Sequence, residues 1–170
     1  GKGLVLAVDS DANSNWNEVL GFKVDTTLGD VREEIAQAEM AAKSPIPAGM
    51  SKADYAEVRF EGALIEDDDF DLLVMGRTQG KGCYCYVNGL LQAQLAKYQN
   101  NYPYFVVDNE AGMEHISRGV LPSMQTAILV SDCSRRGIQA VGRIARLIEE
   151  CNMHPSTVGL IVNRAPKGEL

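Results

Sequence analysis

The sequence lacks any stretch that could cross a membrane, and it is short of basic residues. No apolar run approaches the ~20 residues that span a bilayer, and no pattern typical of a secretory signal peptide opens the sequence. Its 16 Lys and Arg residues are outnumbered by 23 Asp and Glu residues, which gives a net charge of -7. Nucleic-acid-binding surfaces carry clustered Lys and Arg. We therefore expect neither a membrane nor a nucleic-acid partner.

Cysteines are also few. The chain has four, without the paired framework of a small secreted scaffold, and this favours a reducing, cytoplasmic location. The hydrophobic fraction of 45% is that of a globular protein. A chain of 170 residues is long enough to bury one core, so residues 1–170 are predicted to form a single domain.

A phosphate-binding loop is the third missing feature. The motif G-x-x-x-x-G-K-[ST] occurs nowhere in the sequence. Gly80-Lys81-Gly82 contains a lysine between glycines, but it belongs to a cysteine-containing loop and not to a strand-to-helix turn. By itself this chain is therefore predicted to lack ATPase activity.

Five short apolar runs predict β-strands. Each run is continuous, which is typical of strands buried on both faces and hence of a parallel sheet. Helix-like stretches separate the runs, so the sequence predicts an α/β fold with a mostly parallel sheet flanked by helices and right-handed crossovers. The predicted strands are Leu4–Val8, Phe70–Met75, Tyr104–Val107, Thr126–Val130 and Val158–Val162.

Helices are predicted between the strands, at Leu28–Ala42, Val87–Tyr98 and Arg135–Cys151. The last has the clearest apolar stripe, which we expect to belong to the core and not to form a groove for a partner. The stripe consists of Ile138, Val141, Ile144, Ala145 and Ile148.

Residues 43–69 differ from the rest of the chain and are interpreted as an insertion. They hold two prolines and a glycine, and then a helical stretch at Lys52–Phe60. The segment ends in the acidic run Glu66–Asp69, which we expect to be a solvated loop.

Carboxylates follow the predicted strands where a parallel sheet binds its ligands, beyond the carboxyl ends. Asp9 and Asp11 follow the first strand, and Asp108 ends the third. An Asp in that position typically reaches a nucleotide-bound Mg²⁺, and a glycine shortly after it, here Gly112, lets a backbone N–H approach a γ-phosphate. Asp11 is placed to orient an attacking water. Strand-terminal Asp residues are also common helix caps, so this alternative stays open.

Cys83 and Cys85 form a C-x-C in a glycine-rich stretch. Two thiols so close together in a loop suit metal capture better than core packing. A closed zinc site needs four ligands, so the simplest completion is a second copy of the chain across a two-fold axis. The alternative is a pair of ordinary loop thiols. Cys133 and Cys151 are expected to be free, partly buried thiols.

Two longer motifs resemble a known family. Val8-Asp9-Ser10-Asp11 resembles the switch segment of the deviant-Walker ATPases, which include the nitrogenase iron protein and the septum-site and plasmid-partition ATPases. The C-x-C and the run Glu110-Ala111-Gly112-Met113-Glu114-His115 look closer to one branch, the carbon monoxide dehydrogenase accessory ATPases that assist nickel insertion. The resemblance runs from about Leu4 to Asn163.

The resemblance implies a homodimer that binds ATP or ADP with Mg²⁺ and has carbon monoxide dehydrogenase as its partner. Asp11 would be catalytic, whereas Asp9, Asp108, Gly112 and Asn163 would serve the nucleotide. Cys83 and Cys85 would hold Ni²⁺ or Zn²⁺ across the dimer. His115 is expected to form hydrogen bonds and not to bind metal. The family's phosphate loop and its lysine would lie on a strand preceding Gly1, so residues 1–170 are expected to be an incomplete NTPase fold.

Two other functions remain open. A partition or positioning ATPase would need a membrane-binding helix or a basic surface, and this acidic sequence shows neither. A non-enzymatic metal-binding dimerisation module would need no phosphate loop.

Overall fold

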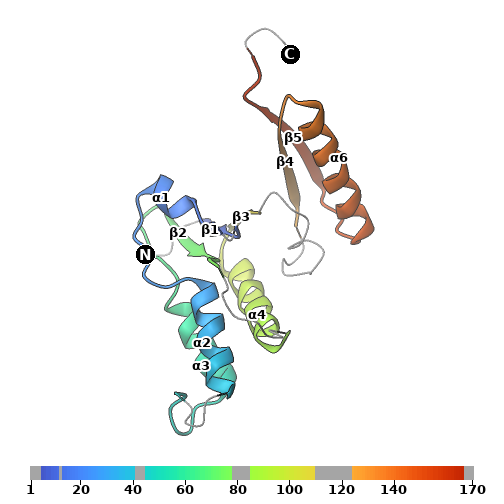
Figure 1. Ribbon diagram of the computed structural model, residues 1–170. Coiled ribbons are helices and arrows are strands. Elements are labelled where there is room, and N and C mark those ends of the chain that lie inside the picture. Colours follow the sequence, from blue (N-terminus) through green and yellow to red (C-terminus); the bar gives the residue numbers. More distant parts are fainter. Residues whose placement is uncertain (1–4, 12, 41–44, 78–84, 110–123, 167–170) are drawn as a thin grey trace. The chain divides into compact units, whose positions relative to one another are not determined.

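A computed structural model describes residues 5–11, 13–40, 45–77, 85–109 and 124–166. They divide into two compact units, Gly1–Ala111 and Gly112–Leu170, each with its own parallel sheet; four described helices belong to the first unit and one to the second (Figure 1). The predicted α/β fold with a parallel sheet is therefore confirmed. That residues 1–170 form one domain, with an insertion at 43–69, stays a prediction.

The first unit has a three-stranded sheet with β1 in the middle. Its strands are β1 (Val5–Asp9), β2 (Phe70–Val74) and β3 (Tyr104–Asp108), in the order β2-β1-β3. Both pairings of β1 are parallel, and Asp9 is in register with Val74 on one side and Asp108 on the other. All three carboxyl ends therefore lie along one edge of the sheet.

Helices of the first unit are α1 (Trp16–Leu20), α2 (Leu28–Met40), α3 (Lys52–Glu61) and α4 (Cys85–Asn101). Capping residues fix where two of them begin. The Thr27 hydroxyl accepts a hydrogen bond from the Asp30 N–H at 3.1 Å, and the Asp30 carboxylate accepts one from the Thr27 N–H at 2.9 Å. This reciprocal pair is a capping box at the start of α2. Ser51 caps α3 by accepting from the Asp54 N–H.

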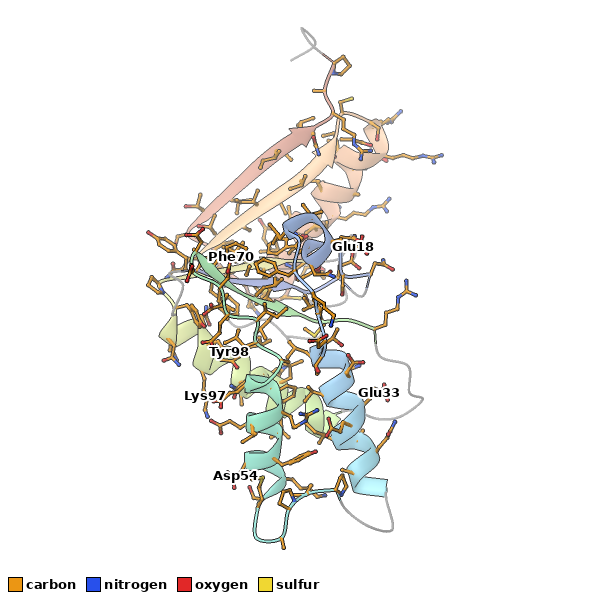
Figure 2. The ribbon with its side chains drawn as sticks, turned by 90° about the vertical axis from the view of Figure 1, so that its left-hand side faces the viewer. Glu18, Glu33, Asp54, Phe70, Lys97 and Tyr98 are labelled. Carbon is orange, nitrogen blue, oxygen red and sulfur yellow. The ribbon has the colours of Figure 1, made fainter. Side chains whose placement is uncertain are left out.

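The core of the first unit lies between these helices and the sheet. The middle strand β1 and its neighbour β2 are buried along almost their whole length, as their apolar runs predict. α3 contributes the buried Phe60, and α4 carries Tyr98 on its buried side and Lys97 on its exposed side (Figure 2). The largest fully buried apolar side chains are Phe60, Leu6, Leu28, Ile35, Leu72, Leu73 and Leu95.

The second unit is a strand-helix-strand element. It contains β4 (Thr126–Asp132), α6 (Arg135–Glu150) and β5 (Thr157–Asn163), and the two strands are parallel (Figure 1). Ser134 caps α6 by accepting a hydrogen bond from the Gly137 N–H at 3.0 Å. Val141 and Ile148 of α6 are buried, and Ile148 packs in a cluster with Ala127 of β4.

Two expectations about burial need correction. Apolar residues on β3, β4 and β5, such as Val106, Ile128 and Leu160, are exposed by about half. In the second unit this follows because the described residues supply one helix, which packs against one face of the two strands. Ile138, predicted as core, is 43% exposed, because at helical spacing it lies to the side of the buried Val141 and Ile148.

The acidic run Glu66–Asp69 is exposed, as predicted. Within the described ranges, each helix is too short or too polar to traverse a lipid bilayer.

Candidate nucleotide and magnesium site

The strand order places a topological switch point at the carboxyl ends of β1 and β3, and we call this edge of the sheet the crevice. From β1 the chain passes to β2 on one side and then crosses to β3 on the other. In open parallel sheets ligands bind where the strand order reverses in this way. Asp9 and Asp108 end these two strands in register, and the Ser10 N–H donates to the Asp108 carbonyl at 2.9 Å. The structure therefore brings the predicted Asp9 and Asp108 together at the switch point.

Asp9 organises the loop that follows β1. It is 1% exposed, and each of its carboxylate oxygens accepts a backbone N–H. Oδ1 accepts from Asp11 at 3.1 Å and Oδ2 accepts from Trp16 at 2.9 Å. Asp9 thus holds the loop between β1 and α1 in place. Asp9 binds the first N–H of α1 from seven residues away and is not its N-cap residue, which is Asn15.

Asp11 lies on that loop and is only partly buried. One of its carboxylate oxygens accepts the Asn13 N–H at 2.8 Å, and its carbonyl accepts from the Ser14 N–H and hydroxyl, both at 3.1 Å. The other carboxylate oxygen accepts no hydrogen bond from the described residues. Asp11 is therefore held in a defined turn and keeps acceptor capacity for a ligand or water.

Negative charge at the crevice is reflected in the pKa of Asp108. The residue is exposed as a whole, but partial enclosure of its carboxyl group raises its pKa. The charges of Asp9 and Asp11 raise the pKa further, and a hydrogen bond from Trp16 partly offsets this. Carboxylates that repel one another are stabilised by a cation. The electrostatics of the crevice therefore fit a positively charged ligand.

Asn109 adds an unpaired acceptor next to Asp108. Its Oδ1 atom is buried and has no hydrogen-bond partner among the described residues. Buried polar atoms are normally paired, and an unpaired one in a site is a place for a ligand or ion. Sequence reasoning gave Asn109 no role, although its position directly after Asp108 was a signal.

Arg77, which follows β2, reaches the same edge. Its guanidinium donates to the Asn13 side-chain oxygen at 2.5 Å, and Asn13 in turn bonds Asp11. The backbone before Arg77 is clamped to the start of α2. Gly76 has φ +67°, and the Gly29 N–H donates to the Met75 carbonyl at 2.7 Å. A Cβ on Gly29 would lie 2.8 Å from the Arg77 carbonyl oxygen. Sequence reasoning did not identify this connection between the two loops.

These residues fit Mg²⁺ bound together with a phosphate. Mg²⁺ is typically held by one or two protein carboxylates, with substrate phosphates and water filling its other positions. Consistent with that, no group of three His, Cys, Asp or Glu side chains in the described ranges is arranged to hold a metal alone. Asp108 and the orphan Asn109 Oδ1 are the atoms that would face such an ion.

Other predicted site residues lie elsewhere or outside the described residues. Cys83, Gly112 and His115 are outside them, and Cys85 is the first residue of α4. Asn163 ends β5 in the second unit, where its Oδ1 accepts the Arg164 N–H at 2.9 Å. Cys151 is a half-buried free thiol, as predicted, whereas Cys133 is exposed and the expectation that it is partly buried was wrong, because it lies in the turn between β4 and α6. The roles of these residues remain predictions.

Comparisons with known proteins identify relatives in sequence and similar solved structures. The chain is 38% identical over 160 residues to an uncharacterized ATP-binding protein of Methanocaldococcus jannaschii, which covers 94% of this chain and 62% of the relative. It is 23% identical over 189 residues to the carbon monoxide dehydrogenase accessory protein CooC of Rhodospirillum rubrum, covering 98% of this chain and 70% of that protein. No protein-family model matches.

Among solved structures, the chain is similar to a ParA family ATPase from Chlorobium tepidum. The TM-score is 0.64 at 18% identity, covering 96% of this chain and 62% of that one. The chain spans 62% of the length of the Methanocaldococcus jannaschii relative, which is less than two thirds. The chain has the α/β fold of the ParA-type ATPases, and its relatives include proteins named for ATP binding.

Proposed function

We propose that this chain provides the Mg²⁺ and water-positioning part of an ATPase of the deviant-Walker type. The observation that carries the proposal is the switch-point crevice. There Asp9 and Asp108 are in register, the pKa of Asp108 is raised by burial and then by its acidic neighbours, and Asn109 has an unpaired buried oxygen among the described residues. The Methanocaldococcus jannaschii relative is named as an ATP-binding protein, and this supports a nucleotide site in the chain.

Each residue has a role that follows from its position. Asp108 would hold Mg²⁺ at the end of β3, where the cation lowers the repulsion among the carboxylates. Asp11 would orient the attacking water through its free acceptor capacity, while Asp9 holds the Asp11 loop by two backbone N–H groups. By resemblance, Gly112 would approach the γ-phosphate and Asn163 the adenine. Mg²⁺ neutralises phosphate charge in such reactions.

More specifically, we propose that this ATPase serves nickel insertion into carbon monoxide dehydrogenase. The similarity to CooC supports this, together with the C-x-C at Cys83 and Cys85. In a homodimer closed by ATP, two C-x-C motifs would supply four sulfurs, a ligand set that suits Zn²⁺ or Ni²⁺. Opening of the dimer would release the metal cargo.

The nucleotide role can be tested by adding a phosphate loop. A β-strand followed by a G-x-x-x-x-G-K-[ST] phosphate loop and its helix would be fused before Gly1, and phosphate release would be measured with Mg²⁺-ATP. We expect activity in the fusion, whereas the 170-residue chain alone should turn over more slowly than about 0.01 per second. In the fusion, Asp11→Asn should lower kcat by about 100-fold or more with nucleotide affinity nearly unchanged.

Asp108→Asn should behave differently. The Asp108 carboxylate would hold the metal already in the ground state, so its loss should weaken the binding of Mg²⁺-nucleotide. Asp25→Asn is the matched control, since Asp25 is an exposed aspartate remote in sequence from the crevice loops. If Asp11→Asn leaves kcat at the level of the Asp25 variant, Asp11 does not position the water.

A further inference from the structure

Helix α6 carries a hollow on its solvent side that the proposed ATPase function does not use. We call it the arginine groove. It has a volume of about 480 Å³ and is lined by Ile138, Gln139, Gly142, Arg143 and Arg146. All five residues belong to α6; at helical spacing Ile138 lies to the side of the buried Val141 and Ile148, and the other four lie farther round the helix, away from them. The groove is therefore a surface of the second unit by itself.

Gly142 forms the floor of the groove and is not required by the fold of this unit. A Cβ added to Gly142 would meet no described atom within 4 Å. Gly137 in the same helix is different, because a Cβ there would lie 2.3 Å from the Asp132 carboxylate. Glycine inside a helix is less stable than alanine. Packing therefore explains Gly137 but gives no reason for the missing side chain at Gly142.

Ile138 supplies an apolar wall. It is 43% exposed, although the sequence pattern placed it with the core residues of α6. An exposed isoleucine is common on its own. Here it stands beside a glycine notch and two exposed arginines, and that combination resembles the centre of a protein interface more than a solvated helix face.

Charges along α6 run against the helix dipole. Its first turn carries Arg135 and Arg136 and no acid, and its last turn carries Glu149 and Glu150 and no base. Helix dipoles favour the opposite distribution. Among the described residues, the ion pairs that form involve Lys23, Arg59 and Lys97, and none involves the arginines of α6. These arginines therefore serve neither the helix nor a described partner.

We propose that the arginine groove docks an acidic segment of another protein that carries an apolar side chain. Carboxylates of the segment pair with Arg143 and Arg146, the apolar side chain packs on Ile138, and its backbone passes over Gly142. Arginine is suited to this role because its planar guanidinium binds carboxylates through two hydrogen bonds. A nucleic-acid backbone would use the arginines but not the apolar Ile138 or the space above Gly142.

The test uses the whole chain and a fluorescein-labelled synthetic peptide, an amphipathic helix of glutamate and alanine with leucines along one face. We expect saturable binding, with shifts of the Gly142 and Ile138 amide resonances in the labelled protein. Gly142→Leu fills the notch and should weaken binding about tenfold or more, as should Arg143→Glu. Both variants should fold, because neither side chain contributes to the described core.

The control is Arg164→Glu, which makes the same change of charge on an exposed residue outside the groove. It should bind the peptide as tightly as the unmodified chain does. The proposal is overturned if the peptide does not saturate, or if Gly142→Leu binds it as tightly as the unmodified chain. It is equally overturned if duplex DNA of matched charge binds more tightly and is unaffected by Gly142→Leu.

Discussion

Replacing Asp9 by alanine is expected to destabilise the first unit strongly. Asp9 is buried, and its two oxygens accept the N–H groups of Asp11 and Trp16. Hydrogen bonds to a charged group contribute about 1.5–3 kcal/mol each, and buried donors left unpaired are costly. Removing the charge also relieves repulsion with Asp108, which offsets part of the loss. The expected cost in the free energy of unfolding is about 2–4 kcal/mol.

The assay is urea unfolding followed by the fluorescence of Trp16, the single tryptophan of the chain. Trp16 begins α1 and donates its backbone N–H to Asp9, so its signal reports the unit that is perturbed. With a slope of about 1–3 kcal/mol per molar urea, the midpoint should fall by about 1–2 M. Asp9→Asn keeps one acceptor oxygen and should lose about half as much.

Asp25→Ala is the control, because Asp25 forms an exposed ion pair with Lys23 and such pairs contribute little. Its unfolding midpoint should stay at that of the unmodified chain. A midpoint for Asp9→Ala that coincides with that of Asp25→Ala would refute the conclusion that Asp9 holds the loop after β1.

Two further predictions concern the crevice and the thiols. Because the pKa of Asp108 is raised in the folded state, its ionised form destabilises the fold; stability is lost as pH rises from the ordinary aspartate pKa through the raised one. Asp108→Asn should therefore be more stable than the unmodified chain at neutral pH and equal to it in acid. Thermal unfolding at several pH values checks this, and a variant less stable than the unmodified chain at neutral pH would contradict it. The chain should bind one Zn²⁺ or Ni²⁺ per two copies. The Cys83→Ser, Cys85→Ser double variant should lose this binding, and Cys133→Ser should keep it. Light scattering during metal titration checks the ratio, and one tight metal per monomer would contradict the shared site.

The strands were the most predictable part of the fold. The apolar runs predicted β1, β2 and β3 almost to the residue, because a strand inside a layered fold needs apolar side chains on both faces. Helix ends were less predictable. The predicted Val87–Tyr98 helix extends from Cys85 to Asn101, since apolar spacing marks a buried face and not the turns at its ends.

The site was predictable only in part. Asp9 and Asp108 could be placed on one edge because parallel strands align their carboxyl ends. Which carboxylate holds the loop and which faces the crevice could not be read from the sequence, because both end apolar strands. The Arg77–Asn13 bond could not be predicted either, since it depends on how two loops distant in sequence meet.

The central position of β1 has a consequence for how the chain folds during synthesis. Val5 pairs with Phe70 on one side and Tyr104 on the other, so every partner of β1 is made after it. Contacts between residues so far apart in the chain form slowly. Leu6 and Val8, both buried in the finished sheet, therefore lack their β2 neighbours until β2 leaves the ribosome and their β3 neighbours until β3 does. During that interval β1 exposes apolar side chains that a chaperone could bind.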